Sequence, residues 1–182
     1  MTPVAFIATF TTAIVNASRN TGIFPSVKMA QMALESGWGA HIIGNNAFGI
    51  KAAGAYSPYW QGAAINADTL EYVNGNYQSG PAMFRAYKSV QDSISDHTYF
   101  LQQNARYTNA GVFSATTPEA QAHALKAAGY ATDPQYAYKL INIINNYNLK
   151  TLDTIAAKAV PAIVPLALLA LLVYGAAKLI RQ

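Results

Sequence analysis

The feature that most constrains this chain is an apolar run of 19 residues near its carboxyl end. Residues 159–177 (AVPAIVPLALLALLVYGAA) contain no charged side chain, and a lysine stands on either side of the run. A helix of this length spans about 28 Å, close to the thickness of bilayer hydrocarbon. A buried core helix is the alternative, but such a helix usually keeps a polar stripe, which this run lacks apart from Tyr174. We therefore predict a single carboxyl-terminal transmembrane helix.

The rest of the chain reads as one folded domain. Residues 1–150 have an ordinary mixed composition and are numerous enough to bury a core without disulfides. We expect residues 151–158 to be a linker, and residues 159–182 to form the membrane anchor and a short basic tail. The apolar stretch at residues 3–15 has no basic residue before it, so it is predicted to be the first helix of the domain rather than a signal peptide.

Composition excludes several classes of function. The chain has no cysteine, so thiolate chemistry and disulfides are excluded. Its 12 Lys and Arg against 8 Asp and Glu give a formal charge of +4, which is too mild to predict a nucleic-acid partner. The three histidines, His41, His97 and His123, are far apart and no HExxH motif is present, so no metal site is expected. No cofactor-binding motif appears either.

The periodicity of residues 1–150 indicates helices around a small sheet, an α+β fold with a groove between a mainly helical lobe and a hairpin lobe. In the first helix, Val4, Ile7, Thr11 and Ile14 recur near helical spacing. Asn-Gly at positions 74 and 75 separates two extended runs and predicts a β-hairpin within residues 63–87. The further helices are expected to start at Pro25, after Ser89, at Pro118 and at Pro134.

A glutamate at the end of an apolar helical turn carries the strongest chemical signal. In QMALESGWG (residues 31–39) the helix is expected to end near Gly37, so that Glu35 lies in its last turn. Leu34 and Trp38 surround the carboxyl group with apolar atoms, and desolvation of this kind raises the pKa of a glutamate toward the working range of a general acid. A solvated glutamate at a helix end is the alternative.

Seven segments of the chain, in order, resemble the family 73 glycoside hydrolases, which are peptidoglycan N-acetylglucosaminidases found on flagellar rod proteins and wall autolysins. The resemblance covers roughly residues 3–149. The segments are IFPSV (23–27), AQMALESGWG (30–39), NNAFGIK (45–51), EYVNG (71–75), FRAYKS (84–89), DH (96–97) and GYATDPQY (129–136). The resemblance implies a lysozyme-like fold and cleavage of the β-1,4 bond that follows N-acetylglucosamine in the wall glycan.

The resemblance also implies roles for particular residues. Glu35 matches the family's essential acid, and Glu71 matches a second carboxylate that approaches from the hairpin to steady or activate water. Asp68 is the substitute for Glu71, and the substrate's own acetamido group is an alternative to both. Tyr130 matches a tyrosine beside the acid.

The same resemblance supplies the expected substrate contacts and the residues that stay structural. Asn46 and Phe48 match the cleft floor, and Trp38 is expected to pack under Glu35; we take these three as substrate-binding. Asp96 is expected to be a buried structural partner, and Asp133 to start a helix.

Three rival functions remain open at this point. A lytic transglycosylase would typically continue into a Gly-Leu-Met-Gln segment where NNAFGIK stands, a muramidase would cut the other glycosidic bond, and a wall-binding module would have lost activity.

The expected partners are peptidoglycan strands and, through the last helix, a lipid bilayer, with the catalytic domain facing the wall. The compact plan of the chain suggests a phage enzyme that opens the wall at infection or release.

Overall fold

The computed structural model describes residues 1–157, and in the first strand it describes the backbone but not the side chains of Leu70, Glu71 and Val73. The predicted transmembrane segment at residues 159–177 and the basic tail lie outside the described residues. Within the described part, no helix is both long enough and apolar enough to cross a membrane.

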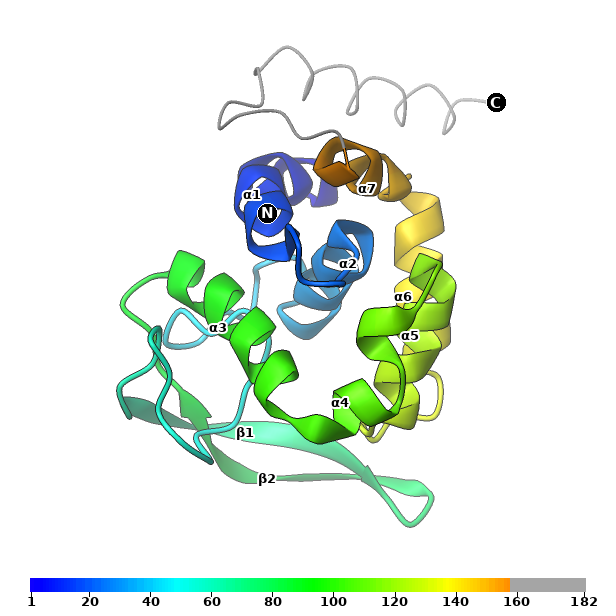
Figure 1. The fold of residues 1–182 in the computed structure, drawn as a ribbon. Coiled ribbons are helices and arrows are strands. Elements are labelled where there is room, and N and C mark those ends of the chain that lie inside the picture. The colour runs from blue at the N-terminus through cyan, green and yellow to red at the C-terminus, as the bar shows by residue number, and fades with distance from the viewer. Residues whose placement is uncertain (158–182) are drawn as a thin grey trace.

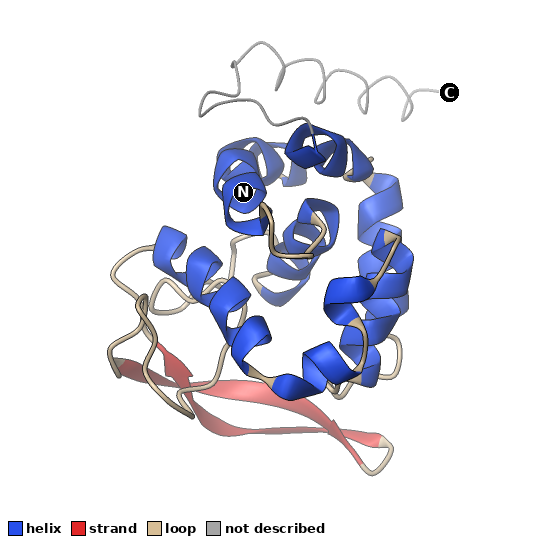
Figure 2. Cartoon of the chain, in the orientation of Figure 1, coloured by secondary structure: helices blue, strands red, loops and turns tan. Residues whose placement is uncertain are grey.

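Helices and one β-hairpin form two lobes, which confirms the predicted α+β arrangement (Figures 1 and 2). The helical lobe holds most of the elements, and the hairpin lies on the side of the molecule opposite α1 and α7. In chain order the elements are α1 (Pro3–Ser18), α2 (Pro25–Glu35), β1 (Ala64–Val73), β2 (Asn76–Arg85), α3 (Val90–Gln103), α4 (Ala105–Asn109), the 3₁₀ turn η1 (Val112–Ser114), α5 (Pro118–Ala127), α6 (Tyr136–Asn146) and α7 (Lys150–Ala157).

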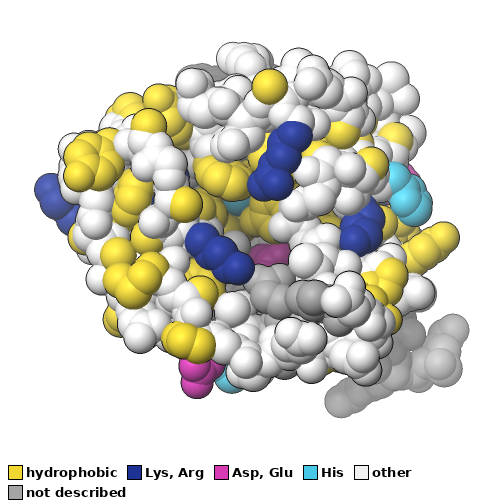
Figure 3. Space-filling model, turned by 90° about the horizontal axis from the view of Figure 1, so that it is seen from below, with side chains coloured by type: hydrophobic (Ala, Val, Ile, Leu, Met, Phe, Trp, Pro, Cys, Tyr) yellow, Lys and Arg dark blue, Asp and Glu magenta, His cyan; other side chains and the backbone are white. Residues whose placement is uncertain are grey.

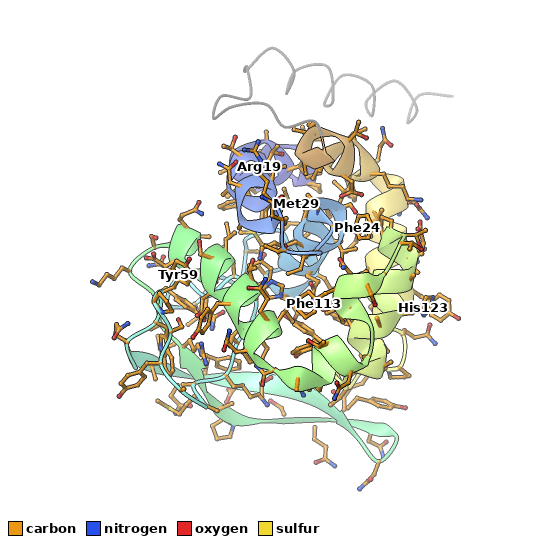
Figure 4. The ribbon with its side chains drawn as sticks, viewed as in Figure 1. Arg19, Phe24, Met29, Tyr59, Phe113 and His123 are labelled. Carbon is orange, nitrogen blue, oxygen red and sulfur yellow. The ribbon has the colours of Figure 1, made fainter. Side chains whose placement is uncertain are left out.

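Helix α2 lies at the centre of the helical lobe, with the other helices arranged around it (Figure 1). Every residue from Pro25 to Ala33 is buried, including the polar Ser26, Lys28 and Gln31. The side chain of Met29 belongs to the same interior (Figure 4). A helix buried all round needs a partner for each polar side chain it carries, because an unpaired polar group in the interior is costly.

The carboxyl end of α2 is closed by the glycine that the sequence indicates. Gly37 has φ +54°, its N–H donates to the carbonyl of Leu34, and the N–H of Trp38 donates to the carbonyl of Ala33. This pair of hydrogen bonds is a Schellman cap, and a side chain at position 37 would collide with the ring of His41. The cap fixes Glu35 as the last residue of the helix.

The hairpin follows its turn signal. Asn74 and Gly75 both have positive φ, as a type I′ turn requires, and the strands pair in register from Ala64 opposite Arg85 to Val73 opposite Asn76. The predicted helix starts after Ser89 and at Pro118 are confirmed, and the Ser89 side chain caps the amide of Asp92.

The first predicted helix is confirmed as α1, in which Thr11 and Ile14 are buried, Ile7 is partly buried and Val4 is exposed. Two expectations about local structure were wrong. The last predicted helix begins at Tyr136 rather than Pro134, since the Asp133 side chain accepts a hydrogen bond from the Gln135 amide in a turn before it. The segment expected to be a linker forms α7.

Helix α7 is part of the folded domain. Leu149 and Leu152 are buried, and both oxygens of the Asp153 carboxylate accept hydrogen bonds from Ser26, one from its amide at 2.8 Å and one from its hydroxyl at 2.7 Å. The residue before α2, Phe24, has no side chain that can cap the helix. Asp153 therefore caps the amino end of α2 from a distant part of the chain.

Because Asp153 caps α2, loss of its carboxylate should destabilise the protein, whereas a substitution at an exposed position of α7 should not. We expect Asp153→Ala to lower the free energy of unfolding by about 1–2 kcal/mol, because two donors of Ser26 lose their acceptor. Thr154→Ala, at an exposed position of α7, is the control. Urea unfolding of both variants measures the difference, and equal stability of the two would rule out the capping role.

Candidate active site

Glu35 stands at the point where the central helix reaches the surface. Its side chain is half-buried, and its Oε1 accepts a hydrogen bond of 3.0 Å from the hydroxyl of Tyr136, the first residue of α6. A Cβ atom placed on the exposed Gly49 would lie 4.0 Å from Oε2. The two carboxylate oxygens therefore differ in their described neighbours, which are the buried Tyr136 hydroxyl at Oε1 and Gly49 near Oε2.

Tyr130 lies beside Tyr136, as its predicted place near the acid requires. The two rings stack at 5.6 Å between centroids, and the Tyr130 hydroxyl is 3.5 Å from the carbonyl oxygen of Phe48. Burial, and next the charge of Glu35, raise the pKa of both tyrosines well above the usual value. Both hydroxyls therefore keep their protons and act as donors near the carboxylate.

Tyr136 was not among the predicted site residues. It stands last in the GYATDPQY segment, and the sequence analysis gave it no role of its own. The contact between Tyr136 and Glu35 joins residues 101 positions apart, so only the packing of α6 against α2 reveals it.

Only the backbone of the second predicted carboxylate, Glu71, can be placed. Glu71 lies in β1 opposite Gln78, and its side chain is outside the described part of the structure. The amide of the next residue, Tyr72, donates to Thr132 Oγ1 at 3.0 Å, so this part of β1 lies against the loop that carries Tyr130. The substitute, Asp68, is exposed opposite Pro81, farther from the turn.

Asn46 has a structural role that the prediction of substrate binding missed. Its Nδ2 donates to the carbonyls of Ile50 and Arg85, and its Oδ1 accepts from the amides of Phe48 and Ile50, each at 2.9–3.3 Å. These four bonds use every donor and acceptor site of the amide group. Asn46 therefore shapes the loop of residues 46–50 and has no polar atom left for a sugar.

The two predicted aromatic contacts also belong to the packing. Phe48 is 2% exposed and stacks on His97 with 4.0 Å between ring centroids, so it offers no face to a sugar. Trp38 makes edge contacts with Phe6 of α1 and with Tyr147, at the end of α6 away from Tyr136. Its ring fills the seam between α1 and the end of α6, where the chain continues after the Schellman cap.

Asp96 is the buried structural partner that the sequence predicts. Its carboxylate pairs with Arg85 at 2.8 Å and accepts hydrogen bonds from Tyr87, at 2.7 Å, and from Ser57. The Arg85 guanidinium also lies over the ring of Trp60, 4.2 Å from its centroid. One buried charge thus ties α3 to the end of β2 and to the loop before β1.

The surface between the lobes is hollowed. Figure 3, which views the molecule from the hairpin side, shows an acidic side chain recessed in a hollow with Lys and Arg side chains on its rim.

A separate cavity of about 300 Å³ lies beside the start of α3, lined in part by Tyr59, Trp60 and Lys88, and it includes none of the predicted site residues. His123 stands on the outer side of α5 (Figure 4). Among residues 1–157, no group of three His, Asp or Glu side chains could hold a metal ion.

Comparison with known proteins identifies the family. The sequence profile of the Glucosaminidase family, described as mannosyl-glycoprotein endo-beta-N-acetylglucosaminidase, matches residues 11–149. The chain belongs to the glucosaminidase family. The prediction that it is a glycoside hydrolase is confirmed at this level.

The similar proteins include enzymes of the bacterial wall. The chain is 40% identical to peptidoglycan hydrolase FlgJ of Pseudomonas aeruginosa over 163 residues, which cover 86% of this chain and 39% of that protein. It is 36% identical to an autolysin of Enterococcus faecalis, with 84% of this chain and 21% of that protein covered. The chain thus spans less than half the length of these two relatives.

Solved structures confirm the lysozyme-like domain. A peptidoglycan hydrolase mutant from Sphingomonas sp. A1 matches 82% of this chain and 97% of its own, with 34% identity and a TM-score of 0.67. The glycoside hydrolase domain of Salmonella typhimurium FlgJ, truncated at its carboxyl end, matches 80% of this chain and 97% of its own, with 38% identity and a TM-score of 0.63.

Behind the Phe48 ring lies a buried basic group that no expectation covered. Lys28 of α2 donates to Thr98 Oγ1 at 2.6 Å, and its Nζ lies 3.2 Å from His97 Nδ1. Burial lowers the pKa of Lys28 to about 7, although the nearby charge of Asp96 acts in the opposite direction. Burial and the charge of Lys28 also hold the pKa of His97 well below the usual value.

These shifts predict a stability that rises with pH. Between pH 7 and the ordinary lysine pKa of 10.5, the unfolded chain binds the Lys28 proton and the folded chain does not. The free energy of unfolding therefore increases across this window, and His97 acts in the same sense at lower pH. Lys28→Met should flatten the increase, because it removes the group whose proton binding differs between the folded and unfolded chains.

Urea unfolding from pH 6.5 to 9 measures both effects. Lys88→Met, at an exposed lysine, is the matched control and should leave the slope of the wild type unchanged. Identical pH slopes for the wild type and Lys28→Met would contradict the assignment.

Proposed function

We propose that this chain is a peptidoglycan hydrolase that cleaves the β-1,4 bond between N-acetylglucosamine and N-acetylmuramic acid, with Glu35 as the general acid. The observation that carries the proposal is the position of Glu35 at the exposed end of a buried helix, with one oxygen held by Tyr136 and the other beside Gly49. A general acid must be positioned within reach of the leaving oxygen, and a scaffold this buried supplies that precision.

The proposal includes a second catalytic group, Glu71. Glu71 lies on the strand whose backbone contacts the Tyr130 loop, and it is our candidate for orienting the attacking water. Attack by such a water would invert the anomeric centre, whereas participation of the substrate's acetamido group would retain it. Tyr130 is expected to orient the water or the acetamido group.

The bond that is cut separates this proposal from its rivals. One relative, 35% identical and from Lactococcus lactis, is named a probable N-acetylmuramidase, so the choice of bond needs a direct test. We expect digested wall to carry reducing N-acetylglucosamine ends. Reducing muramic acid ends would identify a muramidase, and 1,6-anhydro muramic ends would identify a lytic transglycosylase.

Loss of the acid should abolish activity without unfolding the protein. Glu35→Gln keeps the shape of the side chain but cannot donate a carboxylic proton, so wall hydrolysis should fall at least roughly a hundredfold. Glu119→Gln, at a glutamate paired with Lys150 on another helix, is the matched control and should keep full activity. Turbidity of a wall suspension and zymography measure the rates. Wild-type activity in Glu35→Gln would refute the role of Glu35.

For Glu71→Gln we expect a smaller but real loss of wall hydrolysis.

We further propose that residues 159–177 anchor the enzyme in a bilayer. The proposal rests on the length and apolarity of that run, and on the position of α7, which carries the chain to Ala157 beside α1, on the side away from the hairpin (Figure 1). An anchor leaving the domain there would turn the hollow of Figure 3 away from the membrane and toward the wall. A phage origin stays a prediction from the plan of the chain.

Fractionation tests the anchor. Full-length protein should sediment with carbonate-washed membranes, whereas residues 1–157 should stay in the supernatant and keep their hydrolytic activity. The shortened chain must end at 157 rather than 150, because removing α7 would also remove the cap that Asp153 provides to α2. Full-length protein in the supernatant would exclude the anchor.

A further inference from the structure

A chain of two hydrogen bonds runs through the interior to Glu35. The Nε2 of Gln31 donates to the hydroxyl of Tyr136 at 3.1 Å, and that hydroxyl donates to Glu35 Oε1 at 3.0 Å. Gln31 precedes Glu35 by four residues on α2, so both side chains lie on the same face of the helix. Gln31 is 0% exposed and Tyr136 is 2% exposed, so most of this path is shielded from bulk solvent.

The direction of these bonds assigns different tasks to the two oxygens of Glu35. The Gln31 amide occupies a lone pair of the Tyr136 hydroxyl, so the hydroxyl hydrogen is free to point at Oε1. The hydrogen bond to Oε1 occupies a lone pair of that oxygen and therefore favours Oε2 as the site of the proton on Glu35. Oε2 is also the oxygen beside Gly49, where the lack of a side chain leaves room for a substrate.

We propose that Gln31 and Tyr136 are positioning residues that hold Glu35 so that Oε2 delivers the proton to the glycosidic oxygen. This inference rests on the proposed function of Glu35 as the general acid. It adds which oxygen reacts, and which buried groups determine that choice.

The bonds also stabilise the product of the proton transfer. As the bond between the anomeric carbon and the glycosidic oxygen breaks, its electron pair passes to that oxygen, which takes the proton from Oε2. Glu35 is left as a carboxylate whose charge is shared by both oxygens, and the hydrogen bond from Tyr136 to Oε1 becomes charge-assisted. Tyr136 keeps its own proton throughout, because burial and the Glu35 charge raise its pKa well above the usual value.

Removal of the Tyr136 hydroxyl should therefore slow the chemical step. We expect Tyr136→Phe to lower kcat on soluble peptidoglycan strands roughly 10- to 100-fold with little change in KM, because the lost bond forms with the enzyme's own acid and strengthens as charge develops. Gln31→Met, which loses only the donor to Tyr136, should give a smaller loss of the same kind.

The pH profile separates positioning from a structural role. Activity that needs protonated Glu35 falls on the alkaline side, and losing a donor to the carboxylate should move this limb to higher pH. Tyr130 and Tyr136 are the described titratable groups whose pKa values respond to Glu35, and both stay protonated in this range. A merely structural loss would reduce the rate and leave the limb in place.

Tyr107→Phe is the matched control, because it removes another buried tyrosine hydroxyl, one that accepts a hydrogen bond from Arg106. It should match Tyr136→Phe in stability and keep wild-type kcat. If Tyr136→Phe does not fold, Gln31→Met carries the same two readouts.

The outcomes distinguish this inference from the proposed function. An inactive Glu35→Gln together with wild-type kcat, or an unmoved alkaline limb, in the positioning variants would overturn the inference alone. An active Glu35→Gln would instead remove the proposed function on which it rests.

Discussion

The complete burial of α2 is the constraint on which the rest of the structure depends. A helix surrounded by other helices has no solvent to satisfy its polar side chains, so each one must find a partner on a neighbouring element. Ser26 meets Asp153 of α7, Lys28 meets His97 and Thr98 of α3, and Gln31 meets Tyr136 of α6. These bonds fix how the surrounding helices stand relative to the central one.

The same helix positions the proposed acid. Glu35 is the last residue of α2 and is half-buried, while the buried turns before it hold its backbone in place. A carboxylate at the carboxyl end of a helix opposes the helix dipole, and the hydrogen bond from Tyr136 offsets part of that cost. The proposed acid thus sits at the end of a buried helix, and a buried hydroxyl binds one of its oxygens.

The hairpin lobe is attached through a second buried charge. Asp96 joins α3 to Arg85 at the end of β2 and to Ser57 in the preceding loop, and a buried charge needs several partners of this kind to be tolerated. The Asn46 side chain also contributes, because it donates to the Arg85 carbonyl and so holds the loop of residues 46–50 against the end of β2. Asn46, which was expected to bind substrate, therefore supports the site from within the fold.

Local sequence signals determined where several of the elements begin and end, and they indicated Glu35 as the candidate acid. The Asn-Gly turn, the glycine after Glu35 and the Ser89 cap act within a few residues, so their consequences could be predicted without the fold. The tertiary structure alone decided that Tyr136 and Gln31 hold Glu35, that Asn46, Phe48 and Trp38 serve packing, and that residues 150–157 belong to the domain. The reason is physical: a side chain's role depends on which groups take up its hydrogen bonds and cover its apolar surface, and these partners are far away in the sequence, 101 residues for Glu35 and Tyr136 and 127 for Ser26 and Asp153.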